Sequence, residues 1–250
     1  MAPANLKSAE FIAKLKSYRS DVSLKGYASA FPVDKRAGDQ FIGVRMGDVF
    51  KLAKEFIDMP LSEVEKLLES PVHEVRVGGV SIMDFQARSK KTTAQRRKEL
   101  FELYIRRHDR INTWDLVDRS GFYVVGSYLI DKPRDILYKL AHSKQMAERR
   151  TAIISAGQIA MKTGDTVDVI KLAETLLEDK DTFIHKAVGW MLRVVGDIDR
   201  KALLTFLDKH AAAMPTVMLS YATEKLDKSV KEHYRAKRKV NLSDSLKYFA

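Results

Sequence analysis

Hydrophobic residues recur at helical spacing along almost the whole chain. In the segment 183–195 (FIHKAVGWMLRVV), Ile184, Val188, Met191 and Val195 fall on one stripe of a helix, with Ala187 on its flank. Signals for β-hairpin turns are nearly absent, and the chain has only 12 glycines and 6 prolines. Four prolines precede expected helices, where a missing N–H group costs little: Pro60, Pro71, Pro133 and Pro215. The pattern predicts an all-α fold.

A repeat of 36–37 residues runs through these helices. The segments 73–83 (HEVRVGGVSIM), 148–158 (ERRTAIISAGQ) and 184–194 (IHKAVGWMLRV) align with Arg76, Arg150 and Lys186 in register. This period is typical of HEAT-like and ARM-like helical repeats, which stack into a solenoid with a curved inner surface. We therefore predict one repeat domain over 1–250 with a concave basic surface. An irregular helical bundle is the alternative.

Within this single domain, residues 1–40 are expected to form an N-terminal helical cap and residues 41–230 the repeats. Residues 231–250 read as a basic C-terminal tail. The positive charges of the tail are consistent either with contacts to phosphates or with a solvated end of the chain.

Composition narrows the class of function. The 44 Lys and Arg residues exceed the 33 Asp and Glu residues, giving a formal net charge of +11, which favours a polyanionic partner or is simply that of a basic protein. No cysteine is present, so disulfides, zinc–thiolate sites and iron–sulfur clusters are excluded. The six histidines lack ligand spacing, and no phosphate-binding or dinucleotide-binding fingerprint occurs. We expect no metal and no cofactor.

Two further expectations concern location. The N-terminus (MAPANLKSAEF) lacks the apolar core of a secretory signal, and no apolar run approaches the roughly 20 residues that cross a bilayer. We expect a cytoplasmic protein without a membrane partner, associated with the nucleoid if bacterial.

Trp190 is predicted to face outward. It lies about 120° from the apolar stripe of its helix, beside Lys186 and Arg193. A tryptophan on a basic face is suited to stacking on a base or sugar. Burial of Trp190 against the next repeat is the alternative.

The other tryptophan lies in the segment 111–125 (INTWDLVDRSGFYVV). Trp114 and Asp118 are four residues apart and share a helix face, whereas Leu116, Val117, Tyr123 and Val124 point the opposite way. Asp115 is only about 60° from Asp118 and could be the exposed acid instead. Asp118 could also form a salt bridge with an arginine of the next repeat. That role is compatible with catalysis, since a catalytic carboxylate needs an orienting partner.

Two adjacent arginines, Arg149 and Arg150, differ in their expected positions. Arg149 lies over the apolar stripe of 146–160, whereas Arg150 lies clear of that stripe and matches Lys186 in the repeat register. We therefore predict that Arg150 belongs to the functional surface.

An indole can hold a cationic base by cation–π attraction, and a carboxylate can stabilise positive charge on a sugar as its glycosidic bond breaks. At TWDLVD (113–118), ERRTAI (148–153) and FIHKAVGWMLR (183–193), the chain resembles the AlkD family of alkylpurine DNA glycosylases. The resemblance runs from about FIGVRMGDVFKLAKEF (41–56) to the last repeats. The N-terminal region departs most from the family, with a loop of its own around 32–40, so no role is carried over to Tyr27.

The resemblance implies an enzyme that excises N3- and N7-alkylated purines, such as 3-methyladenine and 7-methylguanine, from duplex DNA without flipping the base. Asp118 would be catalytic, with Trp114 and Trp190 flanking the lesion, and Arg150 and Arg193 would contact DNA. We include Lys186, Arg149 and Arg76 as further candidate DNA contacts. No lysine stands out as a Schiff-base nucleophile, so we expect a monofunctional hydrolase without lyase activity. We also expect the protein to be a monomer. The alternatives are a non-catalytic repeat scaffold and a DNA-binding protein without catalysis.

Overall fold

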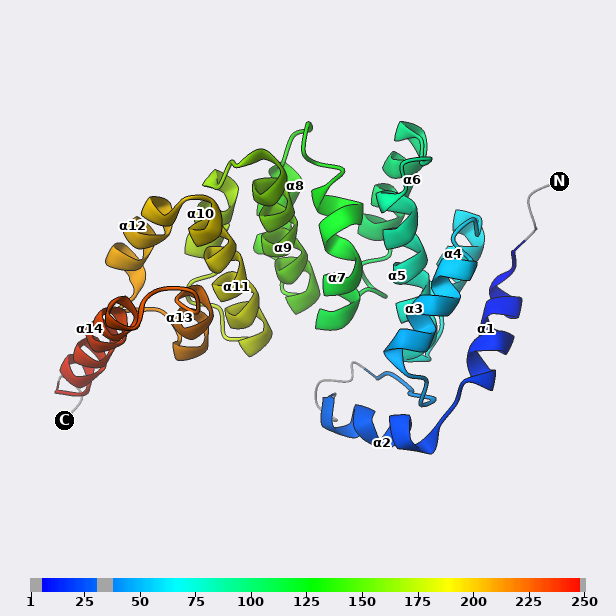
Figure 1. Cartoon of the computed structure of the whole chain (residues 1–250), viewed down its shortest axis with the longest axis horizontal. Helices are drawn as coiled ribbons and strands as arrows, with labels where there is room; N and C mark the ends of the chain where they lie inside the picture. The colour runs from blue at the N-terminus through cyan, green and yellow to red at the C-terminus, as the bar shows by residue number, and fades with distance from the viewer. Residues whose placement is uncertain (1–5, 31–37, 248–250) are drawn as a thin grey trace. The chain divides into compact units, whose positions relative to one another are not determined.

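The computed structural model describes residues 6–30 and 38–247, and there the prediction of an all-α fold is confirmed. These residues form fourteen α-helices and one short π-helix, with no β-strand beyond an isolated bridge between Gln40 and Val72 (Figure 1). This architecture is consistent with a helical repeat solenoid. In the part of the chain that the structure describes, no helix combines the length and apolar character needed to span a bilayer.

The chain divides into two compact units, Met1–Tyr128 and Leu129–Ala250. The first contains α1 (Ser8–Ser17), α2 (Asp21–Ala30), α3 (Met46–Glu55), α4 (Leu61–Leu68), α5 (His73–Arg88), α6 (Ala94–Arg106), α7 (Trp114–Ser120) and the π-helix η2 (Gly121–Gly126). The second contains α8 (Asp135–Ala141), α9 (Met146–Thr163), α10 (Val167–Thr175), α11 (Thr182–Ile198), α12 (Arg200–His210), α13 (Thr216–Ala222) and α14 (Lys228–Lys247). The segment predicted as a tail therefore begins inside α14.

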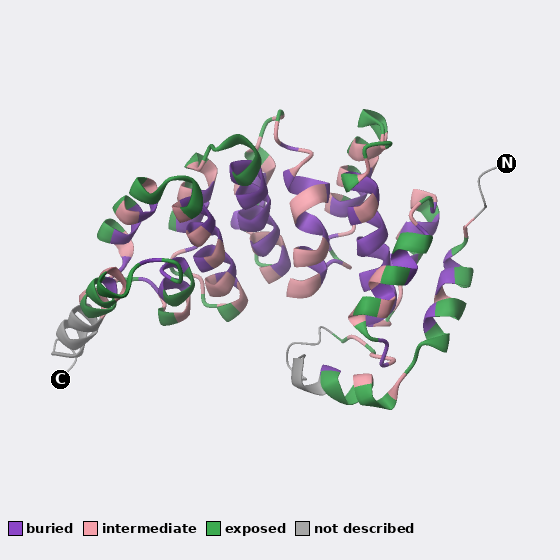
Figure 2. Ribbon diagram, in the orientation of Figure 1, coloured by how far each residue is buried: buried purple, intermediate pink, exposed green. Residues whose placement is uncertain are grey.

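Helix α5 is the centre of the first unit. It packs against α3, α4, α6, α7 and η2, and most of its residues are buried, as its colour in Figure 2 shows. The buried set includes polar and charged side chains, namely His73, Glu74, Arg76, Ser81, Asp84 and Gln86. A buried charge without a partner is strongly unfavourable, so the rest of the unit must supply partners for these groups.

One of these charges organises the backbone before α3. The carboxylate of Glu74 accepts hydrogen bonds from the backbone N–H groups of Ile42 at 3.0 Å, Gly43 at 2.8 Å and Val44 at 3.3 Å. Gly43 has a φ of +81°, and a Cβ there would lie 2.5 Å from the carbonyl oxygen of Ser20. Only glycine fits this turn without strain, and the segment is thereby held against the start of α5.

In the second unit, α9 and α11 form the core. Helix α9 packs against α8, α10 and α11, and α11 also packs against α12 and α13. The predicted core residues of α11 are all buried: Ile184, Ala187, Val188, Met191 and Val195. The apolar stripe predicted for α9 is buried as well, but so are the other residues from Arg150 to Ala160, because neighbouring helices cover α9 on its remaining sides.

Glycine brings α11 and α13 into backbone contact. A Cβ at Gly189 would lie 2.5 Å from the carbonyl oxygen of Met218 and 2.6 Å from Cβ of Tyr221. The first of these atoms is part of the main chain and the second is directly bonded to it, so neither can move without moving the backbone of α13.

We expect Gly189→Ala to lower the free energy of unfolding by about 1–3 kcal/mol, because the added methyl group forces the two helices apart. Gly47→Ala is the matched control: Gly47 lies in α3, and an added Cβ meets nothing within 4 Å. This control should be neutral or stabilising by up to about 1 kcal/mol. Urea unfolding followed by circular dichroism measures both, and equal effects would contradict the close approach.

Candidate functional site

Helix α7 carries the candidate carboxylate and the first tryptophan. Leu116 and Val117 are fully buried, whereas Trp114 and Asp118 are both partly exposed, as their spacing predicts. The hydroxyl of Ser120 donates a hydrogen bond of 2.8 Å to the carbonyl of Leu116 and closes the helix. The π-helix η2 follows at once, and such wide turns recur at functional sites.

The structure separates the roles of Asp115 and Asp118. Both carboxylate oxygens of Asp115 are engaged inside the protein, one by His73 Nε2 at 2.7 Å and the other by the hydroxyl of Thr113 at 2.7 Å. This arrangement favours Asp118 over Asp115 as the acid that meets a substrate.

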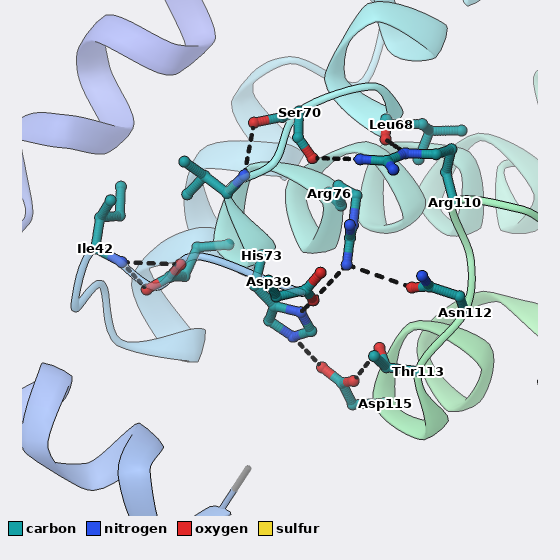
Figure 3. A network of polar contacts seen from close by, with 12 residues as sticks. Asp39, Ile42, Leu68, Ser70, His73, Arg76, Arg110, Asn112, Thr113 and Asp115 are labelled. Carbon is teal, nitrogen blue, oxygen red and sulfur yellow. Dashed lines mark hydrogen bonds and ion pairs between the residues drawn. The ribbon is translucent and has the colours of Figure 1, made fainter. Parts of the chain in front are cut away.

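A buried ionic network holds the start of α7 (Figure 3). His73 Nδ1 lies 2.6 Å from Asp39, and Asp39 also forms an ion pair with Arg76, whose guanidinium lies 3.4 Å from the side-chain oxygen of Asn112. Burial lowers the pKa of His73, but its hydrogen bonds to Asp115 and Asp39 outweigh that effect and raise the pKa to about 9. His73 is therefore an imidazolium at neutral pH.

The position predicted for Arg76 is wrong. Arg76 is only 1% exposed and is neutralised by Asp39, so it lies inside the unit rather than on a DNA-facing surface. Its place in the predicted repeat register does not expose it, because Asp39 and Asn112 contact its guanidinium group.

A second set of contacts fixes the other end of α7. Arg119 Nε donates to the hydroxyl of Ser81 at 2.9 Å, and its guanidinium lies 2.9 Å from the carboxylate of Asp84. The same guanidinium lies over the rings of Phe50 and Phe85. Burial lowers the pKa of Arg119 and raises that of Asp84, but the close contact favours the charged forms of both.

These contacts define which face of α7 is available. Asp115 and Arg119 are four residues apart and bind α5 from one side of the helix. Trp114 and Asp118 have the same spacing one residue earlier, so they lie about 100° around the helix from the anchored pair. We call Trp114 and Asp118 the α7 face.

In the second unit, the prediction that Arg150 lies clear of the core is also wrong. Arg150 is 4% exposed, and its guanidinium donates a hydrogen bond to the carbonyl of Phe183 at the start of α11. Arg149 is partly exposed, but it forms an ion pair with Asp179 at 2.5 Å and donates to two backbone carbonyls at 3.0 Å, those of Ser143 and Lys144. Both arginines join α9 to neighbouring segments.

Helix α11 presents the second tryptophan beside two cations. Lys186, Trp190 and Arg193 follow one another at helical spacing, and all three are partly exposed. We call them the α11 stripe. Lys186 Nζ lies 5.9 Å from the ring centroid of Phe183, and Arg193 forms an ion pair with Glu224. Trp190 is thus outside the core of the unit, as predicted.

Comparison with known proteins places these features in a family. A family model described as DNA alkylation repair enzyme matches residues 11–226. The chain belongs to this family.

A solved structure has a similar fold. It is titled as a predicted DNA alkylation repair enzyme from Enterococcus faecalis, and it aligns with a TM-score of 0.65 over 84% of this chain and 97% of that one. The sequence identity is 14%, so this likeness concerns the fold alone. No curated protein matched.

The sequence of this chain did not indicate the residues that hold α7 in place. They are Asp39, His73, Asn112 and Thr113 of the buried network, and Arg119 at the other end of the helix. One signal was present, because His73, Glu74 and Arg76 occur together at a predicted helix start in an otherwise apolar segment. Within the described residues, no group of three or more His, Asp and Glu side chains is arranged to hold a metal ion.

We expect the stability of the protein to fall as the pH rises from about 7 through 9. The folded-state pKa of His73 is raised, so its contribution is complete below the unfolded pKa of about 6.5 and is lost above about 9. The loss should be on the order of 1–3 kcal/mol. Urea unfolding at several pH values measures it, and His73→Gln should flatten the slope. An unchanged slope in that variant would assign the pH dependence to other groups.

Proposed function

We propose that the protein is a DNA glycosylase that hydrolyses the N-glycosidic bond of cationic N3- and N7-alkylated purines in duplex DNA, as the first step of base excision repair. The observation that carries this proposal is the α7 face: an indole and a carboxylate lie together on a partly exposed helix face, anchored to α5 on the adjacent side. Membership of the DNA alkylation repair family and the net charge of +11 support it.

The chemistry follows from the two side chains. The electron-rich face of Trp114 attracts a positively charged purine more strongly than a neutral one. Alkylation at N3 or N7 already makes the purine a good leaving group, so the enzyme has only to stabilise the sugar cation that develops as the bond breaks. Asp118 supplies a negative charge for that cation and accepts a hydrogen bond from the attacking water. No covalent enzyme intermediate is required.

The α11 stripe is proposed to bind the DNA strand. Lys186 and Arg193 would contact phosphates, and Trp190 would stack on a sugar or base. Arg76, Arg149 and Arg150 are left out of this proposed interface, because their guanidinium groups serve contacts within their own units. We propose further that the lesion stays largely stacked during excision, since both reactive side chains stand on a helix face.

We expect Asp118→Asn to reduce release of 7-methylguanine from methylated duplex DNA by at least a hundredfold, because it removes the charge that stabilises the sugar cation. Binding to unmodified duplex should change little. Chromatography of released bases under single-turnover conditions measures the effect. Asp58→Asn is the matched control, since Asp58 is an exposed acid in the same unit. Release at the unaltered rate by Asp118→Asn would remove Asp118 from the mechanism, and no release by the unmodified protein would favour a non-catalytic DNA-binding role.

We expect Arg193→Gln to weaken duplex binding and to reduce the slope of log K against log salt by about one unit, because one phosphate contact is lost. Arg200→Gln is the control, because Arg200 also forms an ion pair on the surface of the same unit, with Asp227, outside the stripe. Glu224→Gln should act in the opposite direction and tighten binding, since Glu224 competes with phosphate for Arg193. Fluorescence anisotropy at several salt concentrations distinguishes these results, and equal slopes for Arg193→Gln and Arg200→Gln would exclude Arg193 from the interface.

A further inference from the structure

A fully buried histidine lies between two carboxylates from distant parts of the first unit. The His73 side chain is 0% exposed; its Nδ1 lies 2.6 Å from Asp39 and its Nε2 lies 2.7 Å from Asp115. Ionised carboxylates only accept hydrogen bonds, so both ring nitrogens must donate, which requires the imidazolium form. Asp39 belongs to the segment before α3 and Asp115 to the first turn of α7.

The charges of this cluster balance only when His73 is protonated. Asp39 and Asp115 contribute two negative charges, and Arg76 and His73 contribute two positive charges. Two further titratable groups lie close by. Glu74 is satisfied by the backbone N–H groups of 42–44, and the hydroxyl of Tyr27 donates to the carbonyl of Val44 at 2.5 Å. Loss of the proton from His73 would leave a net negative charge in the cluster and would place an unprotonated ring nitrogen against one of the two carboxylates.

The cluster holds the α7 face through Asp115. Helix α7 has only seven residues, too few to be stable by itself, so its orientation depends on tertiary contacts. Asp115 is bonded to His73 and immediately follows Trp114, and Asp118 lies one turn later. Together with the Arg119 contacts at the other end of the helix, the His73–Asp115 contact fixes the rotation of α7 about its axis. This rotation determines where the indole and the proposed catalytic carboxylate point.

We propose that His73 is a positioning residue, a buried imidazolium that joins the segment around Asp39 to the first turn of α7 and sets the orientation of Trp114 and Asp118. This inference rests on the proposed function for its effect on catalysis, but not for its effect on Trp114. It also gives Asp39 a role, since Asp39 acts on the site through His73.

The first experiment reads Trp114 directly and needs no enzymatic activity. Full-length Trp190→Phe contains Trp114 as its single tryptophan. We expect its fluorescence to change with a midpoint near pH 9, where His73 loses its proton, and we expect His73→Gln in the same background to abolish the transition. Trp114→Phe, which leaves only Trp190, is the control and should show no transition near pH 9. A Trp114 signal that is flat from pH 7 to 10, or unchanged by His73→Gln, overturns the proposal.

The second experiment uses two substitutions of His73, each of which keeps a hydrogen-bond donor near one of the two ring nitrogens. The amide nitrogen of Gln lies near the position of Nε2, so His73→Gln keeps a donor for Asp115, whereas the amide nitrogen of Asn lies near Nδ1 and serves Asp39 only. We expect His73→Asn to slow base release by a factor on the order of 10–100 with unchanged duplex affinity, because a small misorientation of reacting groups suffices for such a loss. His73→Gln should recover most of the rate, and its activity should no longer fall near pH 9.

Controls keep the two proposals separable. His108→Gln alters a buried histidine that packs against Tyr104 in the same unit and should leave the rate unchanged. Equal, undiminished rates for His73→Asn and the unmodified protein overturn the positioning role. If the unmodified protein releases no base, the proposed function fails, and the Trp114 titration alone decides the role of His73. A flat Trp114 signal in the Trp190→Phe protein contradicts the proposal even if no His73 variant folds.

Discussion

The first unit is built around the need to neutralise charges that α5 carries into its core. Four charged side chains of this helix are buried, and each has a partner outside α5, either on the segment before α3 or on α7: His73, Glu74, Arg76 and Asp84. Burial of one uncompensated charge would cost several kcal/mol, which is a large fraction of the roughly 5–15 kcal/mol by which folded domains are stable. The positions of the loop before α3 and of α7 follow from this requirement, since these segments bring the missing partners.

This arrangement has a direct bearing on the proposed chemistry. A catalytic group on a short helix is useful only if the helix does not turn or shift when DNA binds. Contacts from Asp115 and Arg119 to α5 hold α7 at both ends, and the remaining side presents Trp114 and Asp118. Ionic anchoring of this kind is directional, whereas apolar packing alone would tolerate rotation.

Periodicity in the sequence was sufficient to predict the helices, the core residues of α11 and the partial exposure of both tryptophans. It failed for Arg150 because a helical wheel separates one apolar face from its opposite and assumes that the opposite face meets solvent. Arg76 was included only through its alignment with Arg150 in the repeat register, and it is buried as well. Neighbouring helices cover α5 and α9 on almost every side (Figure 2), so a cation outside the apolar stripe is still buried there.

The partners of those cations also lie beyond the reach of local patterns. Asp39 is 37 residues from Arg76, and Phe183 is 33 residues from Arg150. Nothing in the spacing of either residue indicates which loop or helix end will close over it. A repeat register identifies equivalent positions along the chain, but what covers each position differs from one repeat to the next.

The backbone contact at Gly189 gives Trp190 an unusual kind of support. The residue just before the indole touches the main chain of α13 with no side chain between the two helices. The spacing of the two helices beside Trp190 is therefore set largely by main-chain atoms, which have no alternative rotamers. The helix that carries this tryptophan is thereby positioned at the residue next to the indole, whatever side chains occur elsewhere along the two helices.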